Sequence, residues 1–182
     1  MRFEGEYVDG GDLHERVIRE GILKAGQSVW IATANLKDLH VRSDGRYVSL
    51  VRILGELSEE GVEVKILHSG NPSGPFLRSY SVTRSHGGEF IHLKRCPRSH
   101  LKAVIVDSRK LYLGSANLTG AGLGAQSEER RNFEIGIVTE DRSAVREVME
   151  LFRLIWDGEF CPECGQRKHC PEPIRCDSWR KK

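Results

Sequence analysis

A histidine and a lysine two positions apart, His100 and Lys102, begin a run of polar residues in the middle of the chain. Histidine can act as a nucleophile and proton carrier near neutral pH, and lysine is a cation that attracts anionic oxygens. Gly114, Ser115 and Asn117 follow in the next strand-like segment and add two hydrogen-bonding side chains. This combination suits chemistry at a phosphate, where a nucleophile attacks phosphorus and donors hold the non-bridging oxygens.

A polar segment from Asp107 to Lys110 separates two apolar runs and predicts a hairpin with a loop of two or four residues. The pairing centred on such a loop sets His100 opposite Asn117 and Lys102 opposite Ser115. Because side chains alternate along a strand, all four are expected on one face. The hairpin would then bring the nucleophile, the cation and both polar groups together.

Asp107 is expected to have a structural role. It is an odd number of positions from His100, so a regular strand would point it to the other face or leave it in the turn. There its carboxylate can accept hydrogen bonds from turn amides or pair with a cation.

Apolar spacing predicts the elements that position these residues. Helical periodicity marks residues 13–23, 47–57 and 145–156, and strand-like runs mark 29–32, 62–67, 101–106, 111–113 and 133–138. Residues 69–89 are rich in Gly, Pro, Ser and Arg and predict a surface loop, as do the charged residues 120–131. The alternation of helices and strands indicates an α/β domain.

Composition bounds the function only loosely. The 182 residues suit one compact domain with a small appendage, and a net charge of +2 is a faint indication of a polyanionic partner. The chain has no apolar run of roughly 18 residues and no secretory signal, so we expect a cytoplasmic protein without a membrane partner.

The full pattern reads His100-x-Lys102-x4-Asp107-x6-Gly114-Ser115-x-Asn117, followed by Glu134 in the segment Asn132-Phe133-Glu134-Ile135-Gly136. It resembles the signature of the phospholipase D superfamily, and the likeness covers roughly residues 8–157. The chain looks most like short members with one motif, which include bacterial endonucleases that act as homodimers. The resemblance implies a mixed β-sheet flanked by helices, with Asp107 and Gly114 as structural members of the motif.

One motif per chain implies a homodimer, because displacement at phosphorus needs a nucleophile on one side and a proton donor on the other. A two-fold axis through the site would supply the second histidine. The resemblance implies a phosphohistidine on one His100, while the partner's His100 protonates the leaving oxygen and then activates water, without a catalytic metal. Lys102, Ser115 and Asn117 are expected to bind phosphate oxygens, and Glu134 to accept a hydrogen bond from His100.

Four cysteines near the C-terminus, Cys161, Cys164, Cys170 and Cys176, predict a structural zinc site with four thiolate ligands. Cys161 and Cys164 stand in a Cys-Pro-x-Cys-Gly segment typical of a metal knuckle, and His169 is an alternative ligand. Disulfides or unligated thiols are the other interpretations. The sequence thus predicts a catalytic domain over residues 1–158 and a zinc-binding tail over residues 159–182.

The leading functional hypothesis is a metal-independent endonuclease acting on DNA or RNA. Arginines are available to hold a phosphate backbone, namely Arg78, Arg84, Arg95 and Arg98. One alternative is a phospholipase or cardiolipin-type hydrolase, which would call for an apolar docking surface. Another is a non-catalytic nucleic-acid-binding module.

Overall fold

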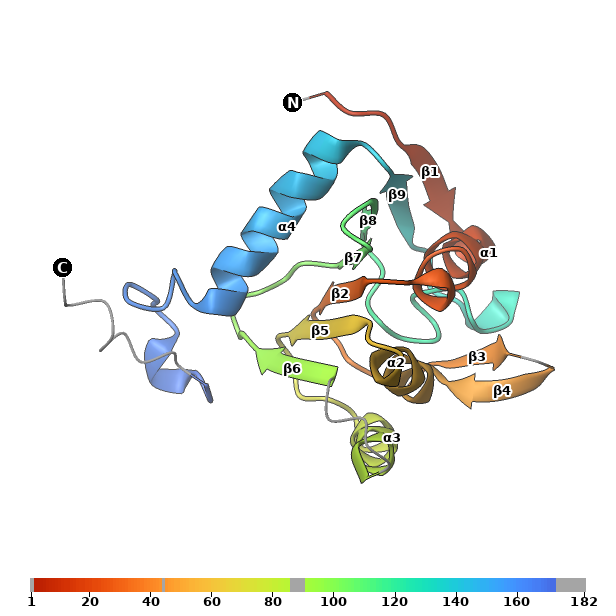
Figure 1. The fold of residues 1–182 in the computed structure, drawn as a ribbon, viewed down its shortest axis with the longest axis horizontal. Helices are drawn as coiled ribbons and strands as arrows, with labels where there is room; N and C mark the ends of the chain where they lie inside the picture. The colour runs from red at the N-terminus through yellow and green to blue at the C-terminus, as the bar shows by residue number, and fades with distance from the viewer. Residues whose placement is uncertain (1, 44, 86–90, 173–182) are drawn as a thin grey trace.

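A computed structural model describes residues 2–43, 45–85 and 91–172, which form a mixed seven-stranded sheet with helices on both faces (Figure 1). The strands are β1 (Glu6–Asp9), β2 (Ser28–Thr33), β5 (Glu63–His68), β6 (Ile91–Arg95), β7 (Ala103–Val106), β8 (Lys110–Gly114) and β9 (Ile135–Thr139). Their order across the sheet is β1-β9-β8-β7-β2-β5-β6. β2, β5 and β6 are parallel, whereas β7, β8, β9 and β1 pair antiparallel.

The helices divide between the two faces of the sheet. They are α1 (Gly10–Leu13), which continues as a π-helix (His14–Arg19), α2 (Leu50–Glu59), α3 (Gly74–Ser85) and α4 (Arg142–Asp157). Short 3-10 turns occupy Ile22–Lys24, Glu128–Arg130 and Arg167–His169. Figure 1 shows α4 running diagonally across one side of the sheet, away from α1, α2 and α3. No helix among the described residues is both long and apolar enough to cross a bilayer.

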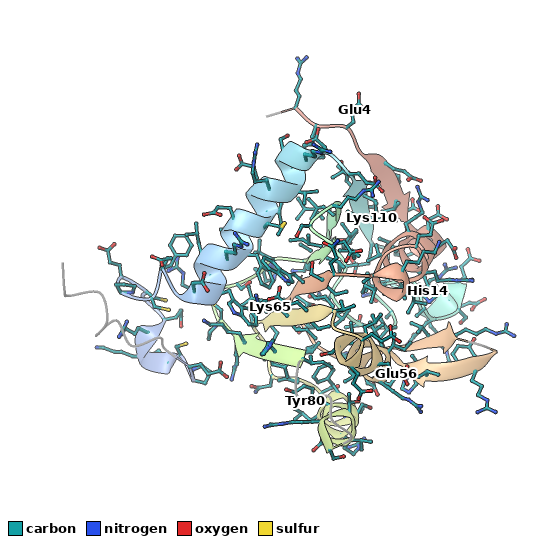
Figure 2. All side chains as sticks on the ribbon, in the orientation of Figure 1. Glu4, His14, Glu56, Lys65, Tyr80 and Lys110 are labelled. Carbon is teal, nitrogen blue, oxygen red and sulfur yellow. The ribbon has the colours of Figure 1, made fainter. Side chains whose placement is uncertain are left out.

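Alternating side chains of β2 fill two hydrophobic cores. Val29 and Ile31 belong to the core under α1 and α2, whereas Trp30 packs with Phe152 of α4 on the other face. A strand that is buried on both faces has a continuous apolar sequence. For this reason residues 29–32 could be recognised as a strand. In Figure 2 the side chains fill the space between α4 and the strands.

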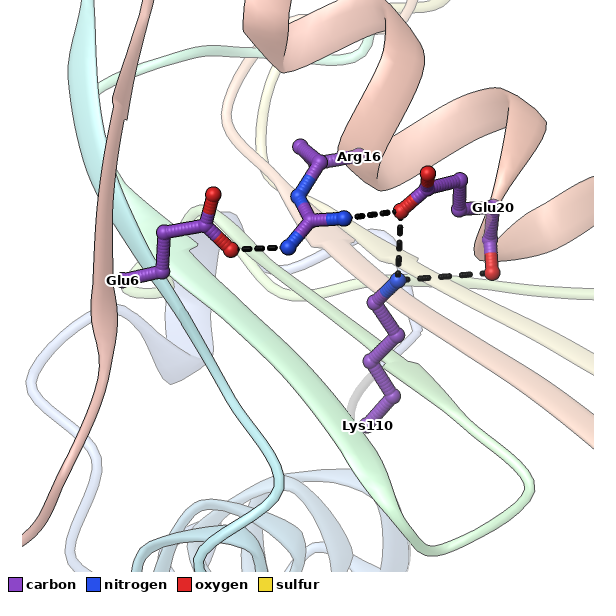
Figure 3. Close-up of polar contacts among 4 residues, drawn as sticks. All are labelled: Glu6, Arg16, Glu20 and Lys110. Atoms are coloured by element: carbon purple, nitrogen blue, oxygen red, sulfur yellow. Dashed lines mark hydrogen bonds and ion pairs between the residues drawn. The ribbon is translucent and has the colours of Figure 1, made fainter.

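Charged side chains tie β1 and the π-helix to the start of β8 (Figure 3). The guanidinium of Arg16 lies between the carboxylates of Glu6 and Glu20. Lys110 Nζ lies 3.3 Å from the backbone oxygen of Glu20 and 3.7 Å from its Oε2. These contacts join the antiparallel half of the sheet to the N-terminal helical segment.

Much of the predicted element order is confirmed. Strands at 29–32 and 62–67 and a helix at 145–156 are present as β2, β5 and α4. The helix predicted over 47–57 begins only at Leu50, because Tyr47 lies in a small hairpin of β3 (His40–Ser43) and β4 (Arg46–Ser49). That hairpin and β1 were not predicted.

The surface loop predicted over 69–89 is wrong where α3 forms. The hydroxyl of Ser73 accepts a hydrogen bond from the backbone amide of Phe76 in its first turn. Phe76 is 1% exposed, Phe76 and Tyr80 stack, and Thr83 is buried against Gly55 of α2. These three positions are at helical spacing, but they stand among polar residues and glycine, which hid the helical signal.

The predicted hairpin register is wrong by one residue. Val106 pairs with Lys110, and the turn has three residues, of which Asp107 and Ser108 have positive φ angles of 54° and 52°. A one-residue shift exchanges the faces on which side chains meet. Lys102 therefore lies opposite Gly114, whose amide donates to its carbonyl at 3.2 Å. His100, Lys102, Ser115 and Asn117 therefore lie outside β7 and β8, while Gly114 is the last residue of β8.

Candidate active site

His100 and Lys102 lie in the extended segment that leads into β7. Lys102 Nζ is 3.2 Å from Nδ1 and 3.3 Å from Nε2 of His100, and 3.1 Å from its backbone oxygen. The imidazole is exposed. The nucleophile candidate and the cation therefore share one accessible space, in which an anionic group can reach both.

Ser115 binds Glu134 in this structure. Its Oγ donates to Glu134 Oε2 and accepts the amide of Ile135 at 3.1 Å. Asn132 Nδ2 donates to the other carboxylate oxygen at 3.1 Å. Since a hydroxyl has one proton, Ser115 here orients Glu134 and has no proton left to offer a phosphate. In the described part of the chain, Glu134 takes these partners instead of the predicted one, His100.

Asn117 connects the site to β2. Its Oδ1 accepts hydrogen bonds from the backbone amides of Ala34 and Asn35, both at 3.0 Å, and from Thr33 Oγ1 at 3.3 Å. Two backbone N–H donors determine which end of the amide is oxygen. Nδ2 is therefore the atom with which Asn117 can bind an anion.

Tyr112 supports the Gly-Ser-x-Asn segment, a role that its place in the sequence did not predict. Its hydroxyl accepts the amide of Ala116 at 3.1 Å. A Cβ at Gly136 would lie 2.3 Å from its ring, and a Cβ at Gly114 would lie 2.4 Å from its hydroxyl. Burial raises the pKa of Tyr112 to about 12, so it stays neutral. In the sequence, the only signals are an aromatic residue in a predicted strand and the glycines Gly114 and Gly136.

Asp107 lies at the far end of β7 from His100. Its carboxylate accepts the backbone amides of Gly26, Gln27 and Ser28 at 2.7–3.2 Å. Burial alone would raise the pKa of Asp107, but these amide hydrogen bonds outweigh it and hold the pKa below its usual value. Asp107 thus connects the turn after β7 to the backbone at the start of β2.

Further polar groups lie where the neighbouring strands β5 and β6 end. His68 is buried, its Nδ1 lies 2.9 Å from the oxygen of Gly70, and desolvation lowers its pKa. Arg95 Nε donates to Ser69 O at 3.1 Å. Of the four arginines considered from the sequence, Arg95 and the exposed Arg98 precede His100, while the other two lie on α3.

The structure gives no support to the predicted zinc site. Cys161, Cys164 and Cys170 are free thiols, and no group of three or more His, Cys, Asp or Glu side chains within residues 2–43, 45–85 and 91–172 could hold a metal. Cys176 lies outside the described residues. A hydrogen bond from Arg98 lowers the pKa of the Cys164 thiol, which places the tail beside the segment that carries His100.

Comparisons with known proteins show the family to which the chain belongs. Residues 18–156 match the family described as the PLD-like domain of cardiolipin synthase. The chain therefore belongs to the phospholipase D superfamily. No curated protein sequence shows a significant match.

Solved structures show the same fold. Nuc from Salmonella typhimurium, a phospholipase D family member, aligns with a TM-score of 0.59 and 20% identity over 85% of this chain and 95% of its own. NucT from Helicobacter pylori aligns with a TM-score of 0.57 and 16% identity over 86% and 97%. TrmBL2, an archaeal chromatin protein, gives 0.56 and 17% over 85% of this chain and 52% of its own.

Proposed function

We propose that this protein is a metal-independent endonuclease that hydrolyses DNA or RNA phosphodiesters. The observation that carries the proposal is the exposed imidazole of His100 with Lys102 Nζ within 3.3 Å of both its nitrogens. A phosphate bound by the ammonium would place its phosphorus beside the nucleophile. Nδ2 of Asn117 supplies a further donor from the neighbouring strand end.

The proposed reaction has two steps. A ring nitrogen of His100 attacks phosphorus, the P–O bond to the leaving group breaks, and the partner's His100 gives that oxygen a proton. The partner's His100 then takes a proton from water, whose oxygen attacks phosphorus and releases His100. The sum is hydrolysis, and no metal ion takes part.

An apolar patch beside the site supports a dimer. Leu113 and Ile137 are paired residues of β8 and β9, and they are 40% and 38% exposed; Ile135 is 57% exposed, and Phe133 is fully exposed. Large apolar surface of this kind commonly marks an interface. Ile135 of this patch forms backbone hydrogen bonds with Ser115 of the site. A second copy seated there would lie beside the half-site it has to complete.

The same patch favours a second candidate, a lipid phosphodiesterase. An apolar surface next to a phosphate site could also contact acyl chains. The chemistry would be unchanged, with a phospholipid such as cardiolipin in place of the polynucleotide.

Incubation with single-stranded DNA, double-stranded DNA, RNA and cardiolipin vesicles in excess chelator separates these functions. We expect the wild type to cleave at least one nucleic acid and the His100→Ala variant to lose activity by 10³-fold or more, an estimate of about 4 kcal/mol. Cleavage of cardiolipin alone would establish the second candidate. Nucleic-acid binding without hydrolysis by the wild type would instead indicate a non-catalytic binding module.

The zinc site remains a separate prediction for the cysteine-rich tail. Zinc analysis of the full chain, beside a Cys161→Ser/Cys164→Ser double variant, tests it directly. One zinc per chain that the double variant loses would support it, and a zinc-free wild type would overturn it.

A further inference from the structure

A charged groove lies far from His100. It has a volume of about 730 Å³ and is lined by the turn that joins β7 to β8 and by one side of α4. Its charged lining residues are Arg109, Glu140, Arg142, Arg146, Glu150 and Arg153. The turn and the His100 segment lie at opposite ends of β7, which puts them about 15 to 20 Å apart at the rise of an extended strand.

Two of the groove's arginines are available for an external anion. Arg142 and Arg146 are exposed, and neither forms an ion pair with any other residue that the structure describes. Arg109 pairs with Glu140 at 3.7 Å, on an exposed part of the surface where such a pair is weak. The lining therefore carries a surplus of two positive charges, equal to the net charge of the whole chain.

The arginines form a row rather than a single point. Arg142, Arg146 and Arg153 follow one another at helical spacing on α4, and the first and last are about 16 Å apart along the axis. The guanidinium of Arg153 lies 5.6 Å from the centre of the Trp30 ring, which holds it in place along the groove. A nucleic-acid strand presents a phosphate about every 3.4 Å along its axis, so several phosphates fit this length.

The shape of the groove also argues for a polynucleotide over a membrane. Its apolar lining residues, Val145 and Met149, are not exposed, so no side chain is available to insert into lipid. The feature is concave, whereas a bilayer surface is close to flat on this scale. A chain of phosphates can enter such a groove.

We propose that this α4 groove is an accessory binding site for the phosphate backbone of a nucleic acid, separate from the site of cleavage. The proposal rests on the nucleic-acid substrate proposed above. It adds that the α4 groove holds a part of that substrate distant from the bond that is cleaved. Contacts of this kind raise affinity without reading sequence. They also make binding strongly dependent on salt.

The test compares an Arg142→Gln/Arg146→Gln double variant with an Arg19→Gln/Arg52→Gln control. Both remove two positive charges, but Arg19 and Arg52 lie outside the groove and pair with Glu15 and Glu56. Because Arg142 occupies the first turn of α4, its loss removes a cation from the positive end of the helix dipole and is not expected to destabilise the fold. Thermal unfolding checks this point.

Binding of a fluorescent 30-base-pair DNA is measured by anisotropy at several salt concentrations. We expect the groove variant to bind about tenfold more weakly and the slope of log Kd against log salt to fall by about 2, with little change in the control. Hydrolysis of bis(4-nitrophenyl) phosphate, which is too small to span both sites, should be equal in all three proteins. An unchanged slope in the groove variant, or an equal loss in the control, would overturn the proposal.

Two further outcomes separate this proposal from the proposed function. If the wild type hydrolyses no diester but the groove variant still loses DNA affinity, the groove is supported and the nuclease assignment fails. If the groove variant loses binding to cardiolipin-containing vesicles and not to DNA, the groove proposal is wrong.

Discussion

The side-chain oxygen Oδ1 of Asn117 accepts a hydrogen bond from the backbone amide of Ala34 at 3.0 Å, and the amide of Asn35 makes an equal bond. One atom of the side chain therefore holds the backbone that leaves β2, and the other, Nδ2, is free to act on a ligand. The structural and chemical contributions of Asn117 can be separated by substitution, because they belong to different atoms.

Asn117→Asp should keep the fold and lose the activity. The carboxylate can still accept both backbone amides, but it removes the donor and places a negative charge beside the substrate phosphate. We expect a loss of phosphodiesterase activity of about 10²-fold or more with a small change in Tm. Asn117→Ala should lose activity and also about 1 to 3 kcal/mol of unfolding free energy, since it leaves two amides without an acceptor. Wild-type activity in Asn117→Asp would remove the phosphate-binding role.

Gly136→Ala should destabilise the protein, because the new Cβ would lie 2.3 Å from the buried ring of Tyr112. Overpacking of this kind costs about 1 to 3 kcal/mol. The shift of the ring should also disturb the amide of Ala116 and lower activity. Gly26→Ala is the matched control, since a Cβ there meets nothing within 4 Å. Chemical denaturation of both variants measures the difference, and equal stabilities would contradict the argument.

Asp107→Asn should reduce stability near neutral pH and leave activity close to that of the wild type. The pKa of Asp107 is lowered in the folded protein from the ordinary 3.8, so its stabilising effect is present above that value. It is lost as the pH falls through the lowered folded pKa. We expect a deficit of about 1 to 2 kcal/mol at pH 7 that shrinks in acid. Asparagine tolerates the positive φ of this position, which isolates the charge. A deficit that grows in acid would contradict this sign.

Ile135→Lys should convert a dimer into an inactive monomer without unfolding it. The side chain is 57% exposed, so the substitution costs little in the single chain but places a charge in the proposed interface. Leu77→Lys, at a 48% exposed apolar position on α3, is the control and should remain dimeric and active. Sedimentation velocity and the diester assay together report the result; an active Ile135→Lys monomer would refute the shared site.

Mixing subunits tests whether one site needs two histidines. With free exchange and about a ninefold excess of His100→Ala chains, roughly one wild-type chain in ten pairs with another wild-type chain. Activity per wild-type chain should then fall about tenfold. A site complete within one chain would show no such fall. Leu77→Lys chains in the same excess, which retain His100, control for the effect of mixing.

The motif residues and the α/β class could be recognised from the sequence because each leaves a local signal. His100, Lys102 and Asn117 stand at short, characteristic spacings. β2 contains a continuous apolar run, and β5 begins with alternating polar and apolar residues. The register of the hairpin, by contrast, depends on the backbone geometry of its turn. Asp107 and Ser108 adopt positive φ angles although neither is glycine, and a three-residue turn follows from that geometry.

Features that depend on contacts between residues far apart in the sequence could not be predicted. The partner of Ser115 is Glu134, which becomes visible only when β8 and β9 are paired. Tyr112 gains its role from glycines on two strands, and α3 is held by a few buried positions in a polar segment. The apolar patch was also missed, because exposure of Ile135 and Ile137 is a property of the assembled sheet and not of their sequence pattern.

Side chains of two motif residues form hydrogen bonds with the backbone at both ends of β2. Asp107 accepts backbone amides at the start of β2, and Asn117 accepts the backbone amides that follow its end. These contacts join residues 79 to 83 positions apart in the sequence. Such distant contacts form late when a chain folds, because long loops must close first. We therefore expect the geometry of the proposed site to form in the same cooperative step as the centre of the sheet. Amide hydrogen exchange in β2 should then follow global unfolding, and a partly folded chain should have no activity.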